Sequence, residues 1–87
     1  MRFDSFYNRE SGTAKRVHEI TGLAGGTTTV TYVGSSKVGA DASKPVWQIM
    51  KVTEVVAGDE TTTTITFPNG SDKYGFVWND HETFSYL

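Results

Sequence analysis

The chain has 87 residues, of which 13% are aromatic and 21% are charged, and its formal net charge is −2. This length allows one domain at most, close to the lower limit for a chain that folds alone. The 8 basic and 10 acidic residues are scattered rather than clustered, so we expect no binding to nucleic acid or to a membrane surface.

The chain offers few means of cross-linking a small fold. It contains no cysteine, and its two histidines, His18 and His81, are far apart in the sequence. A disulfide is therefore impossible, and the spacing does not resemble that of a structural zinc site. Stability must come from an efficient aromatic core or from neighbouring molecules, since each aromatic side chain can bury on the order of 150–250 Å².

Residues 1–15 combine aromatic residues, arginines and turn-forming residues without a regular period. Phe3, Phe6 and Tyr7 would share one side of a helical turn, but Ser11-Gly12-Thr13 ends the segment before a helix can propagate. We interpret residues 1–15 as an extended N-terminal arm, with a frayed terminus as the alternative. The candidate partner contacts on this arm are Phe3, Phe6, Tyr7 and Arg9.

The next segments are typical of β-strands. Residues 16–20 form a short candidate strand, and residues 27–33 form a second one because threonine and valine dominate it. Between them, Gly22 to Gly26 reads as a turn, because it lacks the lysine and the strand-to-helix context of a phosphate-binding loop. Residues 34–44 are small and polar, which favours a long surface loop.

The run from Pro45 to Val56 is the longest apolar segment and the predicted central strand. Strict alternation leaves neither of its faces cleanly apolar, so we predict a β-bulge near Met50-Lys51 that shifts the phase by one residue. The predicted core contacts run from Trp47, Ile49 and Val52 to Ile65, Phe67, Trp78 and Phe84.

The remainder of the chain predicts a hairpin and a mixed C-terminal segment. Residues 57–60 form the hairpin loop, residues 61–67 form the return strand, and Pro68-Asn69-Gly70 ends it. Residues 71–82 fit a strand or a short helical turn, and the polar residues 79–82 favour the turn. Residues 83–87 alternate as a closing strand.

Together these elements predict an all-β fold with residues 16–87 as one small domain. We expect an antiparallel sandwich or a partly open barrel, with a bulged central strand, one short helical turn near the C-terminus and the extended N-terminal arm.

Candidate chemistry is sparse, so we expect no enzyme and no catalytic, cofactor-binding or metal-binding residues. Asp80-His81-Glu82 is better explained as a solvated turn, since three consecutive residues cannot converge on one metal, and a pairing of His81 with His18 has no support in the sequence. No serine lies in a nucleophile elbow. Trp47 and Trp78 could stack on a sugar, but core positions are the better interpretation in so small a domain.

The second half of the chain contains a series of short motifs. They are Tyr32-Val33-Gly34, Val46-Trp47-Gln48-Ile49 with Lys51 and Val52, Pro68-Asn69-Gly70, Val77-Trp78-Asn79-Asp80-His81 and Phe84-Ser85-Tyr86. With these motifs, residues 32–87 resemble a group of short tailed-bacteriophage virion-associated proteins. The pattern of that group is Trp-Gln-Ile, then Ala-Asp-Gly, where this chain has Pro68-Asn69-Gly70, then Trp-Asp-Asp-Arg and a closing tyrosine. This chain departs from that pattern at Met50 and at His81, which puts a salt bridge at the turn in doubt.

The resemblance implies a non-enzymatic structural component of a phage particle, either a head decoration protein or a neck or tail component. Its partners would be copies of itself and other virion proteins, with no nucleic acid, no membrane and no small-molecule ligand. The expected location is the virion, after synthesis in the host cytoplasm, because the sequence lacks a signal peptide and a transmembrane run. The alternative is a small ligand- or glycan-binding β module that uses tryptophan and tyrosine side chains.

Overall fold

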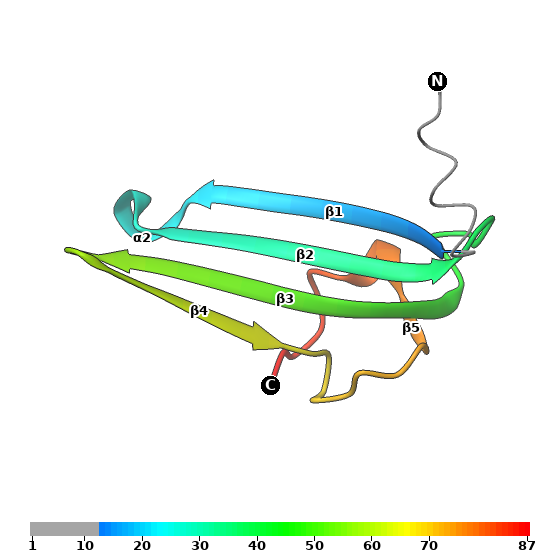
Figure 1. Ribbon diagram of the computed structural model, residues 1–87. Coiled ribbons are helices and arrows are strands. Elements are labelled where there is room, and N and C mark those ends of the chain that lie inside the picture. Colours follow the sequence, from blue (N-terminus) through cyan, green and yellow to red (C-terminus); the bar gives the residue numbers. More distant parts are fainter. Residues whose placement is uncertain (1–12) are drawn as a thin grey trace, which may run out of the picture.

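The computed structural model describes residues 13–87, and most of them belong to one antiparallel sheet (Figure 1). In chain order the elements are β1 (Thr13–Gly22), α2 (Leu23–Gly26), β2 (Thr28–Lys37), β3 (Pro45–Ala57), β4 (Glu60–Thr66), β5 (Phe76–Val77) and the 3₁₀ turn η1 (Trp78–Asp80). The sheet order is β1-β2-β3-β4, and β5 pairs with the start of β3. The all-β antiparallel class and the single helical turn near the C-terminus are confirmed, and the strands form one open sheet.

The connections follow from the residues that they contain. The segment α2 is a left-handed turn rather than a helix, because Gly22, Ala24 and Gly25 have φ values of 80°, 52° and 77°. Between β3 and β4 only Gly58 and Asp59 remain unpaired, and Gly58 has a φ of 65°. A glycine with positive φ at the first position of a two-residue turn matches the twist of the flanking strands.

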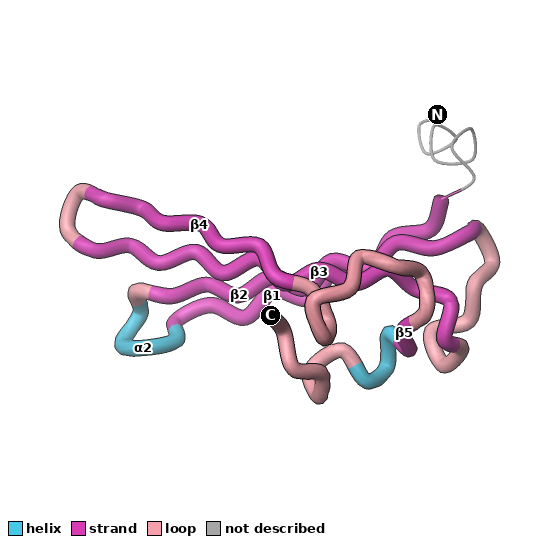
Figure 2. Tube along the Cα trace, turned by 90° about the horizontal axis from the view of Figure 1, so that it is seen from below, coloured by secondary structure: helices cyan, strands magenta, loops and turns pink. Residues whose placement is uncertain are grey.

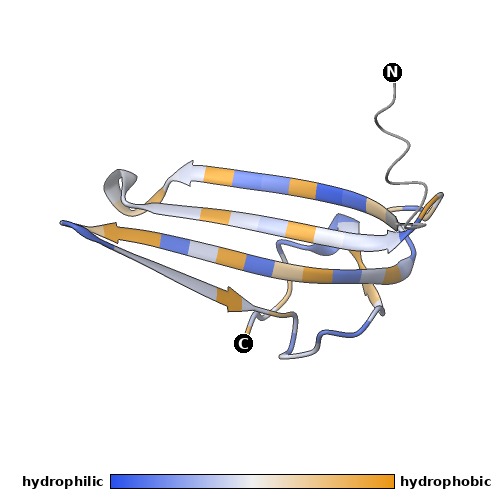
Figure 3. Cartoon of the chain, in the orientation of Figure 1, coloured by the Kyte–Doolittle hydropathy of each residue, from blue (hydrophilic) through white to orange (hydrophobic). Residues whose placement is uncertain are grey.

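Hydrophobic and hydrophilic residues follow one another along the long strands, as the coloured bands in Figure 3 show, and successive side chains point to opposite faces of the sheet. The cross-strand register sets His18, Tyr32 and Lys51 side by side on one face. The next row, which contains Val17 and its partner Val33, therefore points to the other face.

The C-terminal residues 67–87 lie along one side of the sheet, which Figure 2 shows edge-on. The buried core forms between this segment and the sheet, and it consists of Val30, Tyr32, Trp47, Ile49 and Trp78. The core positions predicted for Trp47, Ile49 and Trp78 are confirmed, with Trp47 and Ile49 exposed by only 1% and 0%. Phe84 and Phe76 are half-buried and pack against this core.

Gly34 is the point at which the C-terminal segment comes closest to the sheet. A Cβ atom at this position would lie 2.5 Å from Cε3 of Trp78 and 3.3 Å from Cε3 of Trp47. Real Cβ atoms do not approach carbon atoms this closely, so the glycine in the middle of β2 is required by packing against two indole rings.

The predicted bulge at Met50-Lys51 is wrong. The register between β2 and β3 continues without a shift from Gln48 to Val55, and the irregularity of β3 lies instead between Pro45 and Trp47. The apolar residues of β3 do not need to gather on one face, because both faces carry apolar side chains and only one of them is covered by the C-terminal segment.

The same arrangement corrects two predicted core residues. Val52 pairs with Ile65, and both lie on the face opposite to Ile49. Val52 is half-buried, and Ile65 is 54% exposed. These side chains therefore belong to a surface rather than to the core.

Several predicted boundaries also change. β1 begins at Thr13, so residues 13–15, which were assigned to the arm, pair with β2. β2 continues to Lys37, which shortens the predicted loop to residues 38–44. The closing strand is reduced to an isolated bridge between Pro68 and Tyr86, because Phe84 and Tyr86 turn toward the core.

The described domain is flat and open. Its Cα radius of gyration is 14.8 Å, whereas a compact domain of this size would have a radius of about 11–12 Å. Within residues 13–87, no helix has the length and apolarity needed to cross a membrane.

Candidate functional site

The side of the sheet that residues 67–87 do not cover carries a continuous group of apolar side chains. It crosses all four long strands, and we call it the open face; its residues are Val17, Val33, Met50, Val52 and Ile65. Val17 is 64% exposed and Ile65 is 54% exposed, and the members from the two central strands are half-buried by their neighbours. An apolar sheet face of this kind is unusual for a side that stays in contact with water.

Polar residues surround the open face. On β1, Lys15 donates a hydrogen bond from Nζ to Oγ of Ser35 at 3.1 Å. Glu19 pairs with Thr31, and Glu54 pairs with Thr63. The resulting pattern, an apolar centre with charged and hydroxyl groups at its rim, is that of a protein–protein contact.

The β3–β4 hairpin projects beyond the segment that covers the sheet (Figure 2). Residues 54–65 are all exposed, including Val55 and Val56 at 37% and 45%. The threonines of β4 present hydroxyl and methyl groups on both faces of the hairpin. Residues 61–66 carry no charge, so a neighbouring molecule could cover this part of β4 without burying a charged side chain from it.

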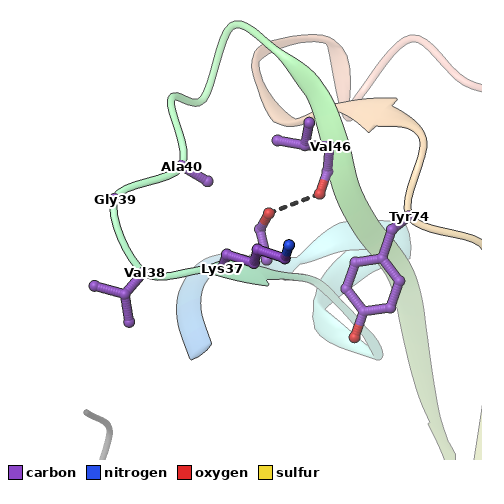
Figure 4. A pocket seen from close by; sticks show the side chains of 7 residues that line it. Lys37, Val38, Gly39, Ala40, Val46 and Tyr74 are labelled. Atoms are coloured by element: carbon purple, nitrogen blue, oxygen red, sulfur yellow. Dashed lines mark hydrogen bonds between the residues drawn. The ribbon is translucent and has the colours of Figure 1, made fainter. Parts of the chain in front are cut away.

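A shallow hollow of about 610 Å³ lies at the opposite end of the sheet (Figure 4). Its lining is formed by Ser36, Lys37, Val38, Gly39, Ala40, Val46 and Tyr74. Ser36 donates a hydrogen bond to the Val46 carbonyl oxygen at 2.6 Å, so its hydroxyl is already engaged. The remaining walls are mostly apolar, and the only charged side chain among them is that of Lys37.

The loop beside the hollow is held by Asp41. Its Oδ1 accepts hydrogen bonds from the backbone nitrogen and the hydroxyl of Ser43, at 2.9 and 2.7 Å, and these bonds lower the pKa of the Asp41 carboxyl. Its carbonyl oxygen accepts a hydrogen bond from Nε1 of Trp47 at 3.0 Å. The buried indole is therefore satisfied, and the loop is tied to the core.

Two histidines meet on the covered side of the sheet. Nδ1 of His18, on β1, lies 2.8 Å from Nε2 of His81, which follows η1. On the other side of the His81 ring, Nδ1 lies 2.8 Å from the Trp78 carbonyl oxygen. Because a carbonyl oxygen only accepts, His81 carries its proton on Nδ1, and a neutral His81 directs the lone pair of Nε2 at His18.

Aromatic rings fix the orientation of His81. The Trp78 indole stacks on it, with ring centroids 4.2 Å apart and an interplanar angle of 16°. Tyr32 meets it edge-on at 4.8 Å. Both of these neighbours are core residues, so the His81 ring is supported by the most buried part of the molecule.

Tyr86 closes this cluster from the C-terminal end. Its hydroxyl donates a hydrogen bond to the His81 carbonyl oxygen at 2.6 Å, and the Nζ of Lys51 lies 5.6 Å from the centre of its ring. Burial, with a smaller contribution from Tyr32, raises the pKa of Tyr86. Burial and the nearby Glu82 carboxylate raise the pKa of Tyr32.

Because the pKa values of Tyr32 and Tyr86 are raised in the folded protein, we expect the protein to lose stability in alkaline solution. Above about pH 10 a tyrosine in the unfolded chain ionises, whereas Tyr86 in the folded chain keeps its proton, so the free energy of unfolding falls as the pH rises. Tyr86→Phe should reduce this fall, and it should cost about 0.5–1.5 kcal/mol at neutral pH through the lost hydrogen bond. Urea unfolding between pH 7 and 11 measures both effects. The exposed Tyr74→Phe is the control, and an equal alkaline fall in Tyr86→Phe would contradict the prediction.

The structure locates most of the residues that the sequence singled out. Phe3, Phe6, Tyr7 and Arg9 lie outside the described residues. Trp47 and Trp78 are buried, which removes them as an exposed stacking platform. Asp80 and Glu82 are exposed at the turn, as predicted, whereas His81 is half-buried and bonds to His18 across 63 residues.

Sequence reasoning missed the open face and the meeting of the two histidines. The only available signal for the open face was the broken alternation of residues 45–56, which we interpreted as a bulge. Nothing in the spacing of His18 and His81 indicates that they are neighbours, because their contact depends on the path of the C-terminal segment.

Comparisons with protein-family models, with curated proteins and with solved structures found no match for this chain. The function proposed below therefore rests on the geometry of the described residues and on the motifs of the sequence.

Proposed function

We propose that this protein is a non-enzymatic structural subunit of a tailed-phage particle, which acts by packing its open face against other copies of itself. The observation that carries the proposal is the apolar open face, which the described residues 13–87 leave exposed, on a sheet whose opposite side already has its core. Head decoration and a neck or tail position are both compatible with this role.

Energetics support a contact between copies. Burial of apolar surface stabilises an association by roughly 25 cal/mol per Å², and the open face offers valine, isoleucine and methionine side chains across four strands. Two such sheets can pack face to face at a spacing of about 10 Å. The outer edges of β1 and β4 have no partner strand within residues 13–87, which gives copies a further means of association.

The phage assignment is supported by the motifs between Tyr32 and Tyr86. Several of these residues have structural tasks in the fold: Gly34 admits two indoles, Trp47 and Trp78 form the core, and Tyr86 bonds to the segment after η1. The resembling phage proteins would share this scaffold, and the particle would supply the neighbours that so open a sheet requires.

The alternative of a glycan-binding module is less favoured by the same geometry. Trp47 and Trp78 are 1% and 7% exposed, so neither presents a ring face to a sugar. Tyr74, at the hollow, is 61% exposed, but a sugar site also needs several polar groups that converge, and the Ser36 hydroxyl is already bonded.

Charge on the open face should weaken association without unfolding the domain. We expect the double variant Val17→Lys, Ile65→Lys to weaken self-association by more than about tenfold, since desolvating each lysine opposes the contact. Its urea midpoint should change little, because both side chains are exposed. Sedimentation velocity over a range of concentrations measures the association.

Val38→Lys is the matched control, because Val38 is 59% exposed but lies in the loop after β2. It should associate like the unmodified protein. If the open-face double variant associated as strongly as the unmodified protein, the open face would not be the contact between copies. Mass spectrometry of purified virions tests the particle assignment separately, and absence of the chain from the particle would refute it.

A further inference from the structure

We propose that His18, His81 and Glu82 bind a divalent transition-metal ion of the Zn²⁺ class. Each of these residues offers one ligand atom, and the three atoms lie within 4.8 Å of one another. The site joins the edge strand β1 to the segment after η1, and it is independent of the open face and of the association proposed above.

The donor set selects the class of ion. Two imidazole nitrogens and one carboxylate oxygen suit Zn²⁺, Ni²⁺ or Cu²⁺, whereas Mg²⁺ and Ca²⁺ require mostly oxygen ligands. Three protein ligands with one position left for water is a known arrangement for Zn²⁺. We therefore expect Zn²⁺ to bind and Mg²⁺ to have no effect.

The distance between the histidines is close to what coordination needs. The two nitrogens are 2.8 Å apart, and two imidazole nitrogens bound tetrahedrally to Zn²⁺ at about 2.0–2.1 Å are about 3.3 Å apart. The two nitrogens must therefore move apart by about half an ångström to admit the ion. A small side-chain rotation of His18, on the edge strand, is enough for this movement.

His81 already has the outer hydrogen bond of a metal ligand. Histidine ligands usually donate their second ring nitrogen to a carbonyl or carboxylate oxygen, which fixes the tautomer and the ring orientation. Here Nδ1 of His81 donates to the Trp78 carbonyl oxygen at 2.8 Å, and the Trp78 indole stacks on the ring at 4.2 Å. Nε2 is thus left to face the space shared with His18.

Binding requires only a change of tautomer at His18. In the neutral pair, Nδ1 of His18 donates its proton to Nε2 of His81. When the ion binds through these two atoms, that proton moves to Nε2 of His18, and both lone pairs point at the metal. No proton is lost from the neutral pair, and no redox step is needed.

Such an ion would supply the cross-link that a chain without cysteine lacks. The two histidines are separated by 63 residues, so the ion would fix the C-terminal segment to the far edge of the sheet. Because the unfolded chain does not hold these residues together, binding adds directly to the stability of the fold.

The test is thermal unfolding of the full chain, first treated with a chelator and then titrated with ZnCl₂. At a free Zn²⁺ concentration about a hundred times the Kd, we expect the Tm to rise by roughly 10–20 °C. MgCl₂ should leave the Tm unchanged. Substituting Co²⁺ should give the visible absorption of a tetrahedral site that contains nitrogen ligands.

Variants assign the ion to these residues. His18→Gln removes a ligand from a half-buried edge position, and it should abolish both the Zn²⁺-dependent rise and the Co²⁺ spectrum. Glu82→Gln should weaken the affinity by more than about tenfold. Glu19→Gln removes a carboxylate next to His18 but on the opposite face of β1, and it should bind like the unmodified protein. An equal Tm rise in His18→Gln, or no rise in the unmodified chain at millimolar Zn²⁺, would overturn the proposal.

Discussion

Trp47→Ala should remove most of the protein's free energy of unfolding. Trp47 is 1% exposed, and replacing a fully buried tryptophan with alanine costs about 3–5 kcal/mol through lost burial and the cavity that remains. A domain of this size has a total stability of only about 5 kcal/mol or little more. Circular dichroism during urea unfolding measures the loss directly.

A conservative variant distinguishes the contribution of apolar burial at Trp47 to stability from that of its hydrogen bond. Trp47→Phe keeps most of the apolar volume but loses the bond from Nε1 to the Asp41 carbonyl oxygen, so it should cost clearly less than Trp47→Ala. Tyr74→Ala, at a 61% exposed aromatic residue, should change the stability by less than about 0.5 kcal/mol. A Trp47→Ala protein as stable as the unmodified chain would show that Trp47 lies at a surface.

Gly34→Ala should have the second-largest effect, although it adds a single methyl group. The new Cβ would lie 2.5 Å from Cε3 of Trp78, whose ring is held between the sheet and His81. Neither neighbour is a flexible chain end, so the C-terminal segment must shift, at a cost of about 1–3 kcal/mol. Because that shift displaces His81, the Zn²⁺-dependent rise in Tm should also weaken.

Gly75→Ala is the matched control for this substitution. Nothing lies within 4 Å of a Cβ at position 75, and the residue keeps the N–H that donates to the Trp47 carbonyl oxygen at 3.2 Å. Its unfolding curve should overlay that of the unmodified protein. If Gly34→Ala gave the same curve, the close packing of Trp78 on β2 would be refuted.

The two proposals concern opposite sides of the sheet, and their tests do not interfere. The open face is proposed as the contact between copies, whereas the histidine cluster is proposed to tie the C-terminal segment to β1. A bound ion would strengthen the covered side while leaving the open face accessible. His18→Gln should therefore lose Zn²⁺ binding but keep the association between copies, and this result would agree with both proposals.

Strand formation follows from residue type and could be predicted locally. β-branched residues between Thr27 and Val33 and between Thr61 and Thr66 indicate strands, and Gly58 indicates the turn that joins β3 to β4. Burial of Trp47 and Trp78 could be predicted as well, because tryptophan has the largest apolar surface of any side chain to bury in so small a domain. The all-β class, the hairpin and the centre of the core could therefore be predicted from residue type and local pattern alone.

Which face of the sheet is covered depends on the path of the C-terminal segment and could not be predicted from local pattern. Residues 67–87 could have completed a second sheet, but they fold across one side of a single sheet instead, so Val52 and Ile65 stay at the surface. The same path brings His81 to His18 across 63 residues. The tendency to form a strand depends on residues that are close together in the chain. The contacts named here depend on where distant segments cross, and they stabilise the protein only once the whole fold has formed.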